Sequence, residues 1–177
     1  MGCWRVNLVV HAASIYPTGR VEAVAWKARG ADMEISTSRF GNLQVSPADI
    51  LLFENGLIGL RQCRRWVVLA DAQNVALGWL QSIDEAETAL GVVSPRRFVA
   101  DYQLRVSRQE LSTLALTNTR DAQVVVIVIR HAEGLSLNLR APLVINVESR
   151  RGRQVIAKDP LPVRLVLPVS GEMRLTA

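Results

Sequence analysis

The residues of this sequence that could do covalent or metal chemistry are few and scattered. Cys63 precedes Arg64 and Arg65, whose adjacent positive charges favour a reactive thiolate, although an incidental thiol is the simpler interpretation. The two histidines, His11 and His131, stand far apart, and neither has a cysteine-rich segment beside it. A zinc site of the usual Cys and His type is therefore excluded, and we predict that His131 is a solvated turn residue rather than a general base.

The carboxylates and glycines complete no catalytic or nucleotide-binding motif. Asp84, Glu85 and Glu87 cluster between two predicted strands, where a solvated loop is expected, because an acid/base pair needs one carboxyl group in an apolar pocket. The glycines at 56–59 lack the third glycine of a dinucleotide-binding loop, and no G-x-x-x-x-G-K-[ST] motif occurs. We therefore predict that the protein is not an enzyme and uses no metal and no cofactor.

The length and composition are typical of one globular domain. The 177 residues are 49% hydrophobic and 21% charged, and the two cysteines indicate a reducing, cytoplasmic setting. No apolar run reaches the roughly 18 residues of a membrane-spanning helix, so no membrane association is expected. A dense alternation of short apolar runs and turn residues begins at Met33. We expect an upstream extension at 1–32, disordered or the result of a misassigned start, a domain at 33–168, and a flexible C-terminal tail at 169–177.

The elements that must position any site are predicted to be mostly strands. Val124–Ile129 is a continuous β-branched run, typical of a strand covered on both faces. Ser107 and Glu110 have the spacing of a capping box, which predicts a short helix ending near Leu116, and Ser46–Asp49 predicts one helical turn. We expect a mainly β fold, a small antiparallel β-barrel-like or sandwich domain with one or two short helices. The predicted strands are 34–39, 43–45, 66–70, 76–82, 88–94, 123–130, 135–140, 143–148, 153–157 and 163–167, with turns at Gly41-Asn42, Glu133-Gly134 and Arg151-Gly152.

Excess positive charge is the compositional signal for a nucleic-acid partner. The formal net charge is +5, and Arg150, Arg151 and Arg153 surround a predicted turn. Single-stranded RNA modules gain about 1–3 kcal/mol per base from aromatic stacking, however, and no Phe, Trp or Tyr follows Tyr102. We predict that these arginines are solvated or lie at the rim of a protein interface, with no direct nucleic-acid binding. The alternative is a small basic RNA-binding β-barrel.

Two late segments carry a family resemblance. Residues 137–146 read Leu-Asn-Leu-Arg-Ala-Pro-Leu-Val-Ile-Asn and residues 150–156 read Arg-Arg-Gly-Arg-Gln-Val-Ile, and both resemble hallmark motifs of the flagellar assembly factor FliW family. Matches at 53–60 and 79–82 agree in order, so the resemblance covers about 33–167. It implies a small β-barrel-like protein of the bacterial cytoplasm without catalytic activity. The implied partners are flagellin and the CsrA-type translational repressor, whose competition or negative coupling on this protein would link flagellin synthesis to secretion.

The positions that match the family's motifs are the candidate partner-binding residues. For Asn138 and Asn146, which stand in apolar strand-like runs, an internal role is an equal alternative, and Leu57 is slightly more suited to core packing than to partner contact. Ile58 and Leu60 replace the family's proline and aromatic residue, and this chain is basic where many members are acidic. The difference in charge favours recognition by apolar contact, or a diverged partner, over charge attraction to a basic regulator. The candidates are Asn55, Leu57, Ile58, Leu60, Gln81, Ser82, Asn138, Pro142, Asn146, Arg150, Arg151 and Arg153.

Overall fold

The computed structural model describes residues 3–6, 32–118 and 121–168, which form strands joined by turns and single-turn helices. The mainly β fold class is confirmed, and none of the helices in these residues is long and apolar enough to cross a membrane. The strands are β1 (Cys3–Val6), β2 (Met33–Thr37), β3 (Gly41–Val45), β4 (Leu51–Leu52), β5 (Arg65–Ala70), β6 (Leu77–Ser82), β7 (Ala89–Val93), β8 (Leu104–Ser107), β9 (Ala122–His131), β10 (Gly134–Leu137), β11 (Leu143–Asn146), β12 (Arg151–Gln154) and β13 (Leu165–Val166). The 3-10 helices are η1 (Pro47–Asp49), η2 (Pro95–Arg97) and η3 (Ser112–Leu114).

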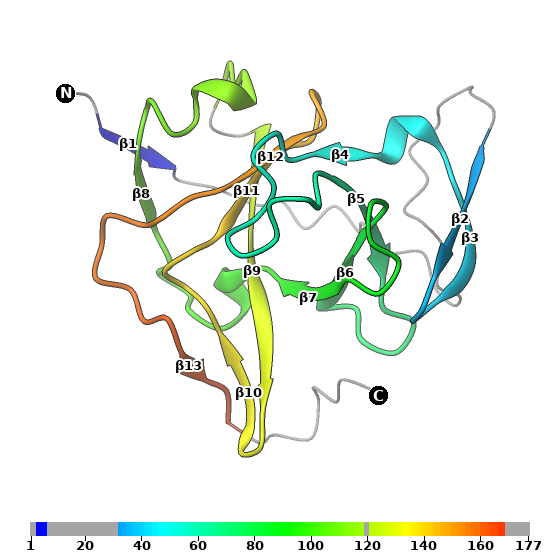
Figure 1. Ribbon diagram of the computed structural model, residues 1–177. Coiled ribbons are helices and arrows are strands. Elements are labelled where there is room, and N and C mark those ends of the chain that lie inside the picture. Colours follow the sequence, from blue (N-terminus) through cyan, green and yellow to red (C-terminus); the bar gives the residue numbers. More distant parts are fainter. Residues whose placement is uncertain (1–2, 7–31, 119–120, 169–177) are drawn as a thin grey trace.

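Seven strands close on one another into a small barrel (Figure 1). Their order is β9, β11, β12, β4, β5, β6 and β7, and β7 pairs again with β9. Every neighbouring pair in this ring is antiparallel except β12 and β4, which meet in parallel at one position, Arg151 opposite Leu52. Strands β10 and β13 continue the sheet from β9, while the β2–β3 hairpin and the β1–β8 pair lie on opposite sides of the barrel.

The strands of the barrel supply side chains to two separate cores. In β9, Val124, Val126 and Val128 belong to the larger core outside the barrel, whereas Val125 and Ile127 pack against the smaller core inside it. Successive side chains of a strand point to opposite faces, so a strand between two cores needs apolar residues at every position. The prediction that this β-branched run is covered on both faces is confirmed.

The predicted helices are shorter in the structure than the sequence signals suggested. The capping box forms, because Ser107 Oγ accepts from Glu110 N at 3.2 Å and Glu110 Oε2 accepts from Ser107 N at 3.0 Å. The prediction of a helix to Leu116 is nevertheless wrong: the bonds close a turn, and η3 ends where Ala115 adopts a left-handed φ of 51°. The predicted turn at Ser46–Asp49 is present as η1, with proline first, although the Ser46 side chain makes no capping bond.

Three boundaries differ from prediction for local reasons. Strand β10 ends early because Asn138 Oδ1 accepts hydrogen bonds from the backbone of Arg140 and Ala141 at 3.2 and 3.1 Å, which begins an Asx turn. The turn predicted at Arg151-Gly152 is wrong, since both residues lie in β12 and the chain reverses at 147–150. The first hairpin turns at 38–40 instead of at Gly41-Asn42.

Some elements had no sequence signal that we recognised. These are β4, β8 and η2, together with β1, which lies within the segment 1–32. β1 pairs in antiparallel fashion with β8, from Cys3 opposite Ser107 to Val6 opposite Leu104. Residues 7–31 and 169–177 lie outside the described residues, so the proposed extension, the domain start at Met33 and the C-terminal tail stay predictions.

Candidate partner-binding groove

A groove of about 250 Å³ lies between the loop that follows β4 and strand β12. One wall is formed by residues 52–61, and the other by β12 with Thr113 of η3. Five of the candidate residues therefore share one site although they belong to two motifs far apart in the sequence. These five are Asn55, Leu57, Ile58, Arg151 and Arg153.

The loop wall is a tight turn that buries one apolar side chain and exposes the next. Gly56 has a φ of +63°, and a Cβ at this position would lie 2.6 Å from the Arg61 Cα, so only glycine fits. The backbones of Leu57 and Leu60 exchange hydrogen bonds at 3.2 and 2.9 Å. Leu57 is 2% exposed in the barrel core, whereas Ile58 is 65% exposed. Of the two interpretations of Leu57, the structure supports core packing.

The strand wall rests on an aromatic ring. Gly152 is buried against Phe53, and a Cβ on Gly152 would lie 2.2 Å from the Phe53 Cζ. A side chain here would force the strand away from the ring, so glycine is what allows β12 to reach β4 and complete the barrel. Because strand residues alternate between faces, Arg151 and Arg153 both point to the face opposite Gly152, which is the groove side.

The two arginines that β12 contributes to the groove are held by η3 and by one carboxylate. Arg151 Nη1 lies 2.8 Å from Glu54 Oε1 across the groove and donates to the Thr113 carbonyl at 3.3 Å. Arg153 Nη1 donates to Thr113 Oγ1 at 3.3 Å. Both side chains are therefore placed by specific contacts. They lie in strand β12 of the groove wall and not in a turn, and the predicted position at the rim of a protein interface stays a prediction. Arg150 lies just outside the groove, in the turn, with a left-handed φ of 56°.

Gln154 fastens the two walls together, although it was not among the candidates. Its Oε1 accepts a hydrogen bond from Ile58 N at 2.8 Å, and its Nε2 donates to the Ala141 carbonyl at 3.2 Å. Gln154 belongs to the R-x-G-x-Q motif and could have been found from it. Three other residues line the groove, namely Glu54, Arg61 and Thr113. Only Glu54 lies within the family match at 53–60, and the other two lie outside the matched segments.

Two candidates lie in β6, away from the groove, and have internal roles. Gln81 is fully buried and its Nε2 donates to the Ser82 carbonyl at 2.9 Å, while its Oε1 has no hydrogen-bond partner among the described residues. Ser82 is 1% exposed, and its Oγ accepts from Asp84 N and Glu85 N at 3.2 and 3.0 Å. These bonds shape the loop between β6 and β7.

Three further candidates, Asn138, Pro142 and Asn146, are structural in the same sense. The Asn138 side chain makes the Asx turn described above, and buried Pro142 precedes β11 and accepts from Val155 N at 3.0 Å. Asn146 is 3% exposed; its Nδ2 donates to the Leu114 carbonyl at 2.9 Å. The buried amide of Asn146 is thus satisfied internally, and half-buried Asn138 uses its oxygen within its own turn, which fits the alternative of an internal role. Direct partner contact by these residues stays a prediction.

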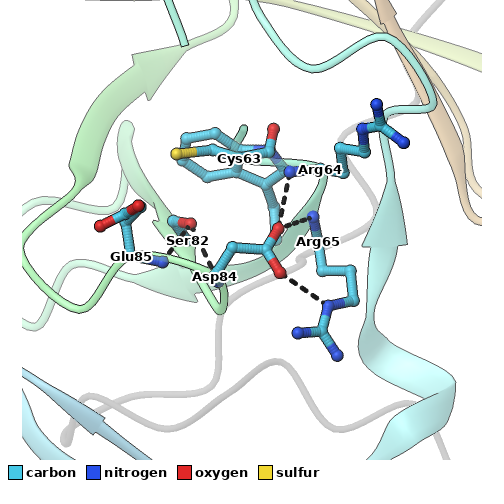
Figure 2. Close-up of polar contacts among 7 residues, drawn as sticks. Cys63, Arg64, Arg65, Ser82, Asp84 and Glu85 are labelled. Carbon is cyan, nitrogen blue, oxygen red and sulfur yellow. Dashed lines mark hydrogen bonds and ion pairs between the residues drawn. The ribbon is translucent and has the colours of Figure 1, made fainter. Parts of the chain in front are cut away.

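A carboxylate clamp fixes the chain at the start of β5 (Figure 2). Asp84 Oδ2 accepts from the backbones of Arg64 and Arg65 at 2.7 and 2.8 Å, and Oδ1 lies 2.8 Å from Arg65 Nε, while the Arg64 side chain points away. Burial works to raise the pKa of Asp84, but these hydrogen bonds and the Arg65 charge outweigh it and hold the pKa below its usual value. The Arg64 carbonyl in turn accepts from Phe53 N at 2.8 Å, so the clamp supports the ring under Gly152.

Cys63 and the metal-binding residue types are the remaining side chains with chemical potential in the described part of the chain. Cys63 is free and fully buried in the barrel core, where its carbonyl accepts from Trp66 Nε1 at 3.0 Å. A thiol in this position is closed to a substrate, as expected for an incidental cysteine. Among the residues that the structure describes, no group of three or more His, Cys, Asp or Glu side chains is placed to hold a metal ion.

The fold and the groove define a class of small β-barrel domains with a basic groove at the barrel seam. A profile of the FliW protein family matches residues 34–166. The chain is 31% identical over 146 residues to the flagellar assembly factor FliW of Magnetococcus marinus, with 81% of this chain and 90% of the relative covered. It is 36% identical over 132 residues to the flagellar assembly factor FliW of Azoarcus sp., with coverages of 70% and 90%.

A solved structure agrees with the sequence comparisons. A crystal structure of the flagellar assembly factor FliW superimposes with a TM-score of 0.71 at 26% identity, covering 77% of this chain and 98% of the other. The chain belongs to the FliW family. The family resemblance drawn from the two late motifs is confirmed.

Proposed function

We propose that this protein is a flagellar assembly factor that acts by binding other proteins. Its partners would be flagellin and a CsrA-type translational regulator, and its action would couple flagellin synthesis to flagellin secretion in the cytoplasm. Family membership supports the proposal, because the relatives in Magnetococcus marinus and Azoarcus sp. are flagellar assembly factors. No reaction step is needed, since such coupling requires only differential binding.

The observation that carries the proposal is the groove, which brings together the family match at 53–60 and the hallmark motif at 150–156. Ile58 is 65% exposed at its rim and Leu52, which also lines the groove, is 38% exposed, so two large apolar side chains face water at this site. Its backbone is fixed by Gln154, and its loop by Gly56. A rigid loop that presents an apolar side chain beside positively charged residues has the character of a protein-binding hot spot with a polar rim.

The proposed coupling is an exchange between two partners. When flagellin accumulates, it occupies the protein and leaves the regulator free to repress flagellin synthesis. When flagellin is secreted, the protein captures the regulator and repression is relieved. Thermodynamically, bound flagellin must lower the affinity of the protein for the regulator, and the bound regulator must lower its affinity for flagellin. A partner that bound equally well to the free protein and to the protein already occupied by the other partner would produce no switching.

Calorimetric titration of the full chain with flagellin and with the CsrA-type regulator of the same organism tests the proposal. Binding is expected to both, and the variant Ile58→Asp is expected to weaken at least one interaction tenfold or more. Val75→Asp is the matched control, because Val75 is 64% exposed and does not line the groove. If neither protein bound more tightly than about 1 mM, which corresponds to about −4.1 kcal/mol, the proposed function would be rejected.

A further inference from the structure

The groove carries more positive than negative charge. Arg61, Arg151 and Arg153 line it, and Glu54 is its one lining carboxylate. Glu54 is already paired with Arg151 at 2.8 Å. Neither Arg61 nor Arg153 has an ion pair with any carboxylate in the described part of the chain. An occupant of complementary charge would therefore be acidic.

The groove also has an apolar side. Ile58 stands at one rim with 65% of its surface exposed, and Leu52 at the end of β4 is 38% exposed. The two residues come from the same wall, opposite the arginines of β12. An occupant that satisfies both sides needs an apolar side chain next to its acidic groups.

The size of the groove limits what can enter it. Pockets that enclose a whole drug-sized ligand have volumes of about 300–1,000 Å³, and this groove has about 250 Å³. It can take one or two side chains, with the rest of the partner lying over the rims. A short segment of a protein chain fits this description, whereas a folded domain could only touch the rims.

We propose that the groove binds a short acidic segment of a partner protein that inserts one apolar side chain beside Ile58, an inference that rests on the proposed protein-binding function. Carboxylates of the segment pair with Arg61 and Arg153. The bond from Ile58 N to Gln154 keeps the loop in place before the partner arrives, so little ordering is required on binding.

A nucleic acid is the other anionic macromolecule that a basic groove could attract, and the lining argues against it. Single-stranded RNA sites depend on aromatic rings that stack on bases. No aromatic residue lines this groove, and Phe53, the ring beneath it, is fully buried under Gly152. In an RNA complex, Glu54 would repel the negatively charged phosphates, and exposed Ile58 would have no apolar group to contact.

Fluorescence anisotropy with a labelled peptide tests the inference on the full chain. The probe is fluorescein-Gly-Asp-Glu-Asp-Leu-Glu-Asp-Gly, which should bind and weaken as salt rises from about 50 to 500 mM. Replacing its acidic residues by lysine should abolish binding, and replacing its leucine by serine should weaken binding at least threefold. Similar binding of the acidic and lysine peptides would overturn the inference.

Charge-reversal variants locate the binding site. Arg61→Glu is expected to weaken peptide binding at least threefold, and Arg61→Glu with Arg153→Glu at least tenfold. Arg130→Glu is the matched control: Arg130 is an exposed arginine of β9, so the variant changes the net charge equally without touching the groove, and its affinity should stay within twofold of the wild type. Arg61 makes no hydrogen bond or ion pair with another described residue, so its variant leaves the contacts of the fold intact. An equal loss in the Arg130 variant would mean non-specific charge attraction and would refute the site.

Two further measurements distinguish a failure of this inference from a failure of the proposed function. A fluorescein-labelled oligouridylate that binds more tightly than the peptide, and loses binding with Arg61→Glu, would assign the groove to RNA. If intact flagellin or the CsrA-type regulator binds but the acidic peptide does not, the inference fails and the proposed function stands. If the peptide binds in the groove while neither intact protein binds, the groove chemistry stands and the proposed function fails.

Discussion

The amide of Asn146 is expected to stabilise the fold without touching a partner. Besides its bond to the Leu114 carbonyl at 2.9 Å, its Oδ1 accepts from Glu148 N at 2.9 Å and from Ser149 N at 3.3 Å. It thus ties η3 to the turn between β11 and β12. Its Nδ2 also donates to the Ala115 carbonyl at 3.5 Å. The variant Asn146→Leu has a similar volume and removes all four bonds, so it tests this role directly.

The expected loss of stability depends on whether each former partner of the Asn146 amide finds another hydrogen bond. A buried polar group left unsatisfied costs about 1–3 kcal/mol. The Leu114 carbonyl keeps a bond from Ser149 Oγ at 3.2 Å, and Glu148 and Ser149 are exposed, so water can reach their N–H groups. We therefore expect a total loss of about 2 kcal/mol. In a protein of this length, that corresponds to a fall in Tm of about 4–8 °C.

The assay is thermal unfolding followed by tryptophan fluorescence, with partner binding measured by calorimetry at a temperature where both variants are folded. Asn55→Leu is the matched control, because Asn55 is exposed in the groove and makes no hydrogen bond with another described residue. Its stability should change by less than about 0.5 kcal/mol. The internal role would be refuted if Asn146→Leu unfolded at the wild-type temperature and yet lost partner binding, since the amide would then belong to the interface.

Three other variants test different parts of the structure. Because the folded pKa of Asp84 lies below its unfolded value, the stabilisation by this carboxylate is complete above about pH 4 and is lost as the pH falls through the folded pKa. Asp84→Asn should therefore have a lower Tm than the wild type at pH 7, and the difference in Tm should shrink at acidic pH. A difference in Tm that stayed constant down to pH 2.5 would contradict the clamp. Gly152→Ala should cost about 1–3 kcal/mol by forcing a Cβ into the Phe53 ring. Gly91→Ala, whose Cβ would meet its nearest atom at 3.5 Å, should cost clearly less, and equal melting curves would disprove the steric argument. A chain shortened to begin at Met33 should fold, because the described core residues run from Ile35 to Leu167, and a Tm more than about 4 °C lower would assign a stabilising role to β1.

The sequence was most informative where one physical signal dominated. The β-branched run of β9 predicted a strand with two covered faces, because no other arrangement accommodates apolar side chains at every position. The motif positions Arg151 and Arg153 lie side by side in the groove wall, although the turn was assigned to the wrong residues. The strand reaches further back than predicted because Gly152, which reads as a turn residue, is needed for close approach to Phe53.

The rest depended on contacts between distant residues. Strand β4 has two residues and exists because it pairs with β5 and meets β12, neither of which a local pattern reveals. The capping box at Ser107 correctly predicted two hydrogen bonds but not a helix, since η3 is held instead by Asn146 and Arg151 from another part of the chain. Gln81 and Ser82 were proposed as contact residues because they match a family motif, and such a match does not distinguish an exposed polar pair from a buried one.

The groove straddles the seam at which the barrel closes. Ile58 and Gln154, whose bond joins its walls, are 96 residues apart along the chain, and Arg151 and Glu54 are 97 apart. Contacts of such high sequence separation carry a large loop-closure entropy and form late in folding. A polypeptide emerging from the ribosome cannot assemble this surface until β12 has been translated. The proposed recognition by this groove therefore requires a chain translated at least as far as Gln154, because fragments that end earlier lack the hydrogen bond that joins the two walls.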